Sequence, residues 1–547
     1  MSDAVVIGSG PNGLVAANVL ADAGWSVDVL EAQPEPGGGV RSDRGAHPDF
    51  VSDVCSAFYP MGVASPVMRA LELERYGLRW RHAPAVLAHP LPGGRCAVLE
   101  RDVHRTAESL EELGAGDGEA WTRLYRRWEH IGDDLLAALF GPFPPLRAGA
   151  SMAARLRAAG MLRMVRFLLS PVRRAGEEEF SGPGGRLLLA GSALHTDLSP
   201  ESTGGTAFGW LLTMIGQQYG WPVPEGGAGE LTGALVRRLE ARGGRVHCDT
   251  PVTSVVVAGG RAAGVRTASG ETVRAGRAVL ADVSAPALYG GLVGWEHLPS
   301  ALRADMRRFQ WDLATFKVDW ALSGPIPWSS PGAARAGTVH LASGMDALTG
   351  YCADLATGRV PGEPFMLLGQ MSTADPTRSP SGTESVWAYT HVPQRVTGDA
   401  GPDGITGVWD ERESTAMADR MERLIERYAP GFRERVVDRR VIDPPAFQRH
   451  NANLRNGALN GGTSAPHQQL VFRPVPGGLG RPETPVPGLY LASASAHPGG
   501  GVHGACGANA ARAALRADGP LGRLVVRPAL AALRRGAHRN SGTRGPT

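Results

Sequence analysis

Lysine is almost missing from this sequence. Of its 56 Lys and Arg residues, Lys317 is the single lysine and all the others are arginine. Cysteine is scarce as well: the five cysteines are scattered and show no CxxC spacing, which excludes a disulfide framework and a paired-thiol redox site. We therefore expect a reducing, cytoplasmic location.

Further absences narrow the function. No apolar run reaches the about 18–20 residues that a membrane-spanning helix requires. No basic segment precedes the first predicted strand, which argues against a signal peptide. The net charge of +3 is small, and basic stripes with interleaved aromatic residues are missing, so we expect no nucleic-acid partner. No metal-ligand spacing stands out, and we expect no metal site.

Glycine, in contrast, is abundant, with 74 of 547 residues. Near the N-terminus a short apolar strand runs into GSGPNG, a helical stretch follows, and a second strand ends on Glu31. In this context Gly8 allows a tight turn, Gly10 lets the backbone approach a pyrophosphate, and Gly13 lets the helix pack on the sheet. The helix N-terminus favours phosphates, and Glu31 is placed for ribose hydroxyls. The pattern predicts a dinucleotide site.

No second site of this kind follows along the chain. GGAGEL at 226–231 lacks a preceding strand, and AGG at 258–260 is typical of a hairpin turn, so direct use of NAD(P)H is not predicted. A length of 547 residues is too great for one compact core and predicts two intertwined domains.

Several blocks, in this order, resemble the phytoene desaturase-related FAD oxidoreductases, a branch of the flavin amine oxidase superfamily. They include GSGPNGLVAA, LEAQPEPGGGVRS, FGWLLTMIGQQYGWPVPEGGAGEL and LYLASASAHPGGGVHGACG, and the resemblance extends to about residue 517. It implies an α/β fold in which a Rossmann-like FAD-binding domain of the glutathione reductase type is interleaved with an α+β substrate domain. We assign FAD-binding segments to 1–100, 221–300 and 451–520, a mostly helical substrate or lid region to 101–220, the substrate domain to 301–450 and a basic tail to 521–547.

The resemblance also implies which residues meet FAD. In the second motif Gly38 and Gly39 would pass under the flavin side, and Arg41 would offer donors to the diphosphate region; a plain surface turn is the alternative. The backbone of Val252 would touch the adenine end. The C-terminal glycine loop leads into a helix N-terminus suited to an electron-rich cofactor group, and its cofactor-binding residues would be Gly500, Gly501 and Val502.

The single lysine stands in the stretch WDLATFKVDWAL. Phe316, Val318 and Trp320 share one face of a predicted strand, and Lys317 and Asp319 share the other. The pattern resembles the flavin amine oxidase strand whose lysine holds a water beside the reactive flavin nitrogen. A compact ammonium group suits that role and a planar guanidinium does not. We therefore predict Lys317 as the catalytic residue; the alternatives are a surface ion pair with Asp319, and chance.

Other candidates carry weaker signals. Tyr389 and His391 in VWAYTHVP are predicted to line the substrate cavity, with a buried, hydrogen-bonded role as the alternative. His195 in GSALHTDL is interpreted as structural. His497 and His503 flank the C-terminal glycine loop and are expected near the flavin. Cys506 raises covalent flavin attachment as an alternative, which the surrounding motif disfavours.

The functional hypothesis is a phytoene dehydrogenase-like FAD-dependent desaturase or oxidase. It would remove hydride equivalents from an apolar, isoprenoid- or carotenoid-like substrate and pass them to oxygen or a quinone. One alternative is a flavin oxidase of an amine or secondary metabolite, which an aromatic cage around Lys317 would favour. The other is a low-turnover flavoprotein that acts as a membrane-associated or regulatory partner. The basic amphipathic stretch at 151–171 and the tail suggest peripheral membrane contact, against ordinary packing on the protein itself.

Overall fold

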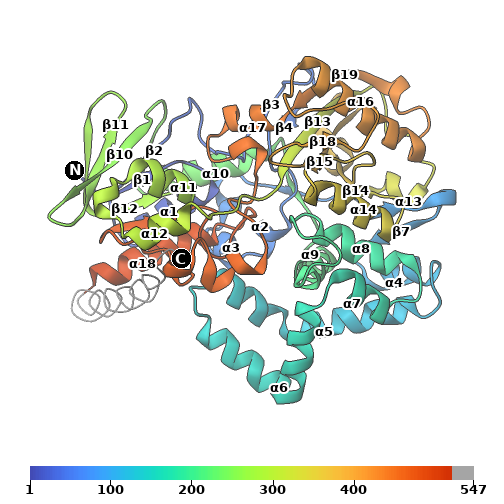
Figure 1. The fold of residues 1–547 in the computed structure, drawn as a ribbon, viewed down its shortest axis with the longest axis horizontal. Coiled ribbons are helices and arrows are strands. Elements are labelled where there is room, and N and C mark those ends of the chain that lie inside the picture. The colour runs from blue at the N-terminus through green and yellow to red at the C-terminus, as the bar shows by residue number, and fades with distance from the viewer. Residues whose placement is uncertain (520–547) are drawn as a thin grey trace, which may run out of the picture.

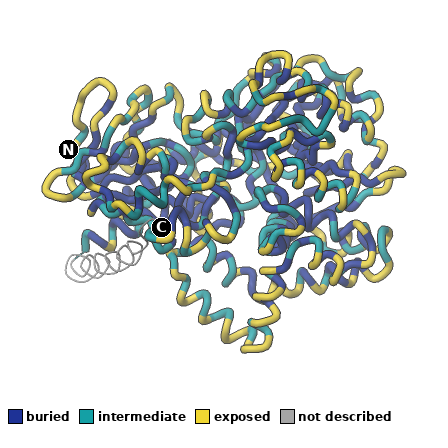
Figure 2. Tube along the Cα trace, viewed as in Figure 1, coloured by how far each residue is buried: buried dark blue, intermediate teal, exposed yellow. Residues whose placement is uncertain are grey.

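The computed structural model describes residues 1–519, so the predicted basic tail lies outside the described residues. Two seven-stranded sheets dominate the fold and lie side by side with helices around them (Figure 1). Buried residues follow both sheets and the helices packed on them (Figure 2).

The first sheet is assembled from three separate pieces of the chain. Its strands are β1 (Ser2–Ile7), β2 (Val27–Leu30), β9 (Arg245–His247), β10 (Val252–Ala258), β11 (Arg261–Thr267), β12 (Thr272–Ala281) and β20 (Leu489–Leu491). The parallel part follows the order β20, β12, β1, β2, β9, and β10 and β11 form a hairpin that pairs antiparallel with the first half of β12. Residues 4–7 of β1 are apolar and buried, and so are three of the four residues of β2, because a parallel sheet is covered on both faces.

Helices close the faces of this sheet. Helix α1 (Pro11–Asp22) connects β1 to β2, begins with a proline at its first position, and packs against α10 (Ala228–Glu240) and α18 (Ala505–Asp518). This is the strand–turn–helix–strand unit that the N-terminal glycines predicted. The predicted fold class, a Rossmann-like domain built from separate segments and interleaved with a second α+β part, is confirmed.

The second sheet contains both parallel and antiparallel strand pairs and is the central sheet of the second part of the fold. Its strand order is β19 (Val436–Ile442), β13 (Ala314–Leu322), β17 (Glu384–Val392), β16 (Met366–Gln370), β14 (Ala336–Leu341), β6 (Ala85–Pro90) and β7 (Cys96–Leu99). One face packs on α16 (Glu411–Tyr428) in an apolar core that contains Phe316, Val318 and Trp320, as the alternation along β13 predicted. The other face is turned toward the first sheet's loops.

One predicted boundary differs from the structure. β6 and β7 lie at the edge of the second sheet, although we assigned residues up to 100 to the first FAD-binding segment. β6 pairs parallel with β14, some 250 residues later in the chain, for example Ala85 with Ala336 and Leu87 with Thr338. Such long-range pairing leaves no local trace in the sequence, so the second sheet begins before the point where composition changes.

Residues 101–220 are helical. The helices are α4 (Val103–Glu111), α5 (Asp117–Phe140), α6 (Leu146–Leu169), α7 (Val172–Glu179), α8 (Pro183–Ala193) and α9 (Gly205–Tyr219). α6 is broken at Arg157, which has a φ of 55°, and it projects from the body of the molecule (Figure 1). Among residues 1–519, no helix has the length and apolar character needed to cross a membrane.

Candidate functional site

A cavity of about 780 Å³ lies where the loops of the first sheet meet the second sheet. Its walls combine the N-terminal glycine loop, the segment after β2, the C-terminal glycine loop, helices α8 and α9, and strands β14 and β17. Ten of the fourteen predicted site residues line it: Gly8, Gly10, Glu31, Gly38, Gly39, Val252, Tyr389, Gly500, Gly501 and Val502. Gly13, Arg41, Lys317 and His391 do not belong to its lining.

The N-terminal glycines form a tightly packed loop at one end of the cavity. Gly8 has a φ of 89°, a conformation that glycine adopts without strain. A Cβ atom on Gly13 would lie 2.2 Å from the carbonyl oxygen of Gly8, so α1 approaches the strand as closely as a glycine permits. Gly13 therefore has the packing role that its position predicts, and it acts behind the cavity wall.

Glu31 stands at the end of β2 beside this loop. Its carboxylate accepts hydrogen bonds from the backbone N–H and the hydroxyl of Ser9, at 2.8 and 2.6 Å, and from the N–H of Gln33 at 3.0 Å. It is buried and lines the cavity. These bonds fix the carboxylate at the place where ribose hydroxyls of a nucleotide would reach it.

Asp282 is a site residue that the sequence did not indicate. It follows β12, lines the cavity, and accepts a hydrogen bond of 2.8 Å from the N–H of Gly13. Burial raises the pKa of this carboxyl to about 7, with the charge of Glu31 contributing in the same direction and the bond from Gly13 opposing. A Cβ on Gly10 would lie 2.6 Å from its Oδ2 atom, so the carboxyl group fills the space beside the loop.

The second glycine run packs on the first. Gly38 has a φ of 58°, and a Cβ there would lie 3.1 Å from the Cα of Gly10. Arg41 donates to the carbonyl of Gly38 at 3.2 Å and to that of His450 at 3.0 Å. In this structure the guanidinium therefore ties the glycine run to the segment after β19, whose residues 450–454 also line the cavity.

The C-terminal glycine loop forms another wall. Gly501 has a φ of 107°, and a Cβ on Gly500 would lie 2.5 Å from Asn460 Oδ1. His503 is fully buried; its Nδ1 accepts from the N–H of Ala505 at 3.0 Å, and its Nε2 has no partner within the protein. Burial lowers the pKa of His503 to about 4, so the neutral ring carries its hydrogen on Nε2. His497, which we expected near the flavin, and Cys506 are both buried and do not line the cavity.

Another part of the cavity wall is apolar. It is made of Met61, Leu139, Phe208, Leu211, Leu212 and Trp387. Trp387 and Tyr389 stack with ring centroids 5.8 Å apart and an interplanar angle of 12°. A Cβ on Gly369 of the neighbouring strand would lie 2.4 Å from Trp387, so this glycine makes room for the indole. His391, two residues beyond Tyr389, is buried outside the lining.

Lys317 lies just behind the cavity wall in an ionic network. Its Nζ donates to the backbone carbonyl of Asp53 at 2.9 Å and forms a short ion pair with Asp319. Asp319 is also bound by Arg440, at 2.7 and 3.0 Å. The side chain of Lys317 is 2% exposed, which rules out the surface ion pair that we considered. Its charge partly offsets the effect of burial, which raises the pKa of the cavity residue Cys55 to about 11.

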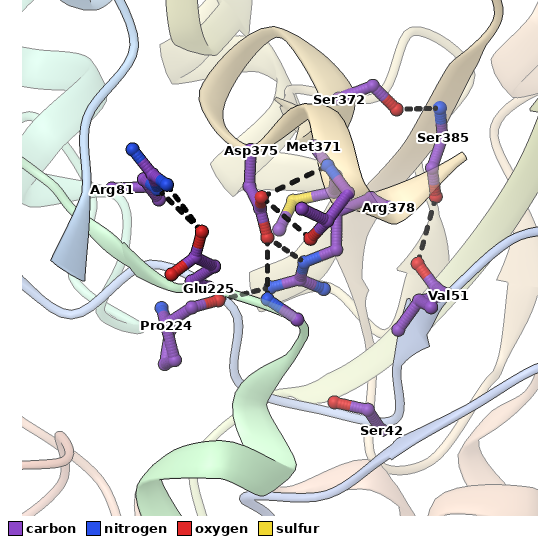
Figure 3. A network of polar contacts seen from close by, with 12 residues as sticks. Ser42, Val51, Arg81, Pro224, Glu225, Met371, Ser372, Asp375, Arg378 and Ser385 are labelled. Carbon is purple, nitrogen blue, oxygen red and sulfur yellow. Dashed lines mark hydrogen bonds and ion pairs between the residues drawn. The ribbon is translucent and has the colours of Figure 1, made fainter. Parts of the chain in front are cut away.

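Arg378 extends this network. It is fully buried and binds Asp53 at 3.0 Å, Asp375 at 3.0 Å and the carbonyl of Pro224 at 3.2 Å. Figure 3 shows the guanidinium between Asp375 and Pro224, next to the turn that leads into α10. The network joins the N-terminal segment at Asp53, the start of α10 and the second sheet, so it fixes the two parts of the fold around the cavity.

No group of three or more His, Cys, Asp and Glu side chains within residues 1–519 is arranged to hold a metal ion.

Comparisons with known proteins agree with this picture. The profile of the family described as flavin containing amine oxidoreductase matches residues 12–308. A rat protein named pyridine nucleotide-disulfide oxidoreductase domain-containing protein 2 is 29% identical to this chain. The alignment covers 94% of this chain and 93% of the rat protein. The neurosporene-forming phytoene desaturase of Cereibacter sphaeroides is 24% identical, covering 96% of both chains.

Two solved structures show a similar fold. An oxidoreductase from Methanosarcina mazei superposes with a TM-score of 0.60 at 16% identity, covering 94% of this chain and 99% of its own. Putrescine oxidase bound to putrescine gives a TM-score of 0.58 at 17% identity, covering 94% and 98%. At this identity the likeness concerns the fold alone.

Proposed function

Since the chain belongs to the family of flavin-containing amine oxidoreductases, we propose that it is an FAD-dependent desaturase or oxidase of an apolar substrate. It would remove hydride equivalents and pass them to oxygen or a quinone. The observation that carries this proposal is the continuous cavity that joins the glycine loops of the dinucleotide fingerprint to an apolar chamber on the second sheet. One continuous space is what a flavin and an apolar substrate need in order to meet.

The residues present fit FAD. The positive φ of Gly8 and the tight packing at Gly10 and Gly38 leave backbone groups, not side chains, to face a diphosphate at the N-terminus of α1. Glu31 would hold the ribose, and Val252 borders the same end. At the C-terminal loop, His503 would donate its Nε2 hydrogen toward the flavin region.

The bound flavin would supply the redox chemistry, by accepting a hydride equivalent from a substrate C–H bond. The protein's contribution is to position the substrate and exclude water. The walls formed by Leu211, Leu212 and Trp387 exclude water, and Tyr389 borders them with its ring stacked on Trp387. We further propose that Lys317, one layer behind Cys55, tunes the flavin through its charge.

An apolar substrate fits this chamber better than an amine cation. The two carboxylates among the described lining residues, Glu31 and Asp282, both stand at the N-terminal glycine loop. On the second-sheet side no described lining residue is acidic, so an ammonium group there would be buried without a counter-charge.

The test is direct. Purified protein is examined for flavin by its visible absorbance, and the cofactor is released and identified as FAD or FMN. The holoprotein is then mixed anaerobically with polyprenoid and carotenoid lipids and with amines. Bleaching by the lipids supports the proposal, whereas bleaching by amines alone, or a protein that binds no flavin, contradicts it.

We also propose peripheral membrane contact through α6. The helix contains five arginines and no acidic residue, and it projects from the body (Figure 1). Leu146, Leu162 and Leu169 are 76%, 72% and 53% exposed. A basic helix that exposes leucines is suited to an anionic bilayer surface, where an apolar substrate would be dissolved. The other arrangement that we considered, packing of this face on the protein itself, does not occur at these leucines.

A further inference from the structure

The wall of the cavity on the second-sheet side holds three polar groups without partners. They are the hydroxyls of Ser192 and Thr338 and the indole N–H of Trp221, none of which has a hydrogen-bond partner within the protein. All three residues line the cavity, and they are only 1%, 2% and 3% exposed, respectively. Buried polar groups are almost always paired, so three exceptions in one wall require an explanation. We call these three residues the polar wall.

A pair of histidines holds the polar wall together. His195 lies three residues after Ser192, in the turn that follows α8. The centroid of its ring is 5.4 Å from that of Trp221, with an interplanar angle of 82°. Its Nε2 lies 3.0 Å from the Nε2 of His340, which shares one face of β14 with Thr338. The polar wall is therefore one assembly of α8, β14 and the segment after α9. His195, interpreted from sequence as structural, is itself part of the cavity lining.

The packing around His340 is equally specific. A Cβ on Gly191 would lie 2.4 Å from the His340 Nδ1 atom, so a glycine at this point of α8 lets the helix approach the histidine. Directly opposed residues on neighbouring strands share one face of a sheet. From His340 these pairs run across the sheet: His340 pairs with Leu367, Leu367 with Tyr389, and Tyr389 with Lys317. The polar wall thus continues the same sheet face that bears the predicted site residues.

The polar wall carries no charge. No described residue of the cavity lining is a lysine or an arginine, and its two carboxylates stand at the glycine loop. Burial lowers the pKa of His195 to about 3 and that of His340 well below its usual range, so both rings are neutral at physiological pH. An ionised headgroup of either sign would meet no counter-charge here, and a pure hydrocarbon would leave the three polar groups unpaired.

We infer that the polar wall binds an uncharged oxygen-bearing group, a hydroxyl or a carbonyl, at one end of an otherwise apolar substrate. The indole N–H can only donate, so the bound group must offer an acceptor, and the two hydroxyls can donate to it or accept from it. This inference rests on the proposed function and narrows its substrate class from hydrocarbons to oxygenated lipids.

The experiment uses calorimetric titration of the holoprotein with 1-decanol, 2-decanone, decane, decylammonium and decanoate. We expect the alcohol and the ketone to bind about tenfold more tightly than the alkane and the two ions, from one or two net hydrogen bonds. Thr338→Val and Ser192→Ala should each weaken decanol binding about fivefold and leave decane binding unchanged.

A matched control separates binding from folding. The hydroxyl of Thr315 is also buried without a partner, but Thr315 does not line the cavity. Thr315→Val and Thr338→Val both remove an unpaired buried hydroxyl, so neither should lower the unfolding midpoint in urea. Only Thr338→Val should weaken decanol binding.

The inference is overturned if decane binds as tightly as decanol, if an ion binds most tightly, if no probe binds, or if Thr338→Val behaves like Thr315→Val. The flavin absorbance of the same samples tests the proposed function separately. A flavin-containing protein that binds no alcohol would overturn only the inference about the polar wall. A flavin-free protein that binds decanol through Thr338 would overturn only the proposed function.

Discussion

Replacing Lys317 by methionine tests both its role in the buried ionic network and its proposed effect on the flavin. Met has a similar length but no charge, so Lys317→Met removes one partner of a buried ion pair and the hydrogen bond to the Asp53 carbonyl. Breaking a buried pair costs about 3–5 kcal/mol when the remaining charge is left alone. Here Asp319 keeps Arg440 at 2.7 and 3.0 Å, so we expect the free energy of unfolding to fall by about 2–3 kcal/mol.

The matched control is Arg440→Met. It removes the other partner of Asp319 and also the partner of Asp43, at 2.6 and 2.7 Å, so it should destabilise the protein by at least as much. The loss is measured by urea denaturation of the flavin-loaded proteins. The proposed tuning of the flavin is measured by reducing each protein with dithionite and following reoxidation by oxygen in a stopped-flow instrument, which requires no substrate.

If Lys317 acts on the flavin, Lys317→Met should retain FAD but reoxidise about tenfold more slowly, equivalent to about 1.4 kcal/mol in the barrier, while Arg440→Met keeps the wild-type rate. Equal reoxidation rates in all three proteins would refute the flavin role and leave Lys317 as a structural residue. An unchanged free energy of unfolding in Lys317→Met would refute our account of the network.

Three further predictions follow from particular contacts. Asp282 has a folded-state pKa of about 7, above its unfolded value, so its ionisation destabilises the fold increasingly as the pH rises from about 4 to 7; a diphosphate nearby favours the protonated form. FAD titrations of apoprotein should therefore give tighter binding at pH 6 than at pH 8, and Asp282→Asn should flatten this dependence. Gly13→Ala places a Cβ 2.2 Å from Gly8 O and should abolish flavin binding, measured as flavin per protein, whereas Gly149→Ala, with nothing within 4 Å, should bind normally. Leu162→Asp on α6 should reduce co-sedimentation with anionic vesicles several-fold without changing flavin content; equal sedimentation would contradict membrane contact.

The sequence predicted those parts of the site that are formed by residues close to one another in the sequence. Gly8, Gly10 and Gly13 stand within one turn between a strand and a helix, so their spacing alone indicates the loop that they form. The same holds for the alternation of Lys317 and Asp319 against Phe316 and Val318, which the two faces of β13 confirm.

The parts that the sequence missed depend on distant residues. Asp282 reaches Gly13 across 269 positions, and no local motif marks it. Ser192, Trp221 and Thr338 come from three segments that meet only because α8 and β14 pack together. The available signal was a weak one, a serine inside an apolar helix and a threonine inside an apolar strand, and such residues usually pair with the backbone.

Two sets of buried polar groups, one on β13 and β19 and one shared by α8 and β14, differ in a way that separates stability from binding. Lys317, Asp319 and Arg440 satisfy one another, so their burial is explained by the fold that they hold together. Ser192 and Thr338 have no such partners, and an alanine or a valine in their place would remove that unpaired burial. Thr315 on β13 shows that an unpaired buried hydroxyl also occurs outside the lining of this cavity. The two unpaired hydroxyls and the unpaired indole N–H belong to residues that line the same cavity beside a neutral histidine pair. Together they point to a ligand that completes their hydrogen bonds, so the substrate chemistry is better sought at the polar wall than at Lys317.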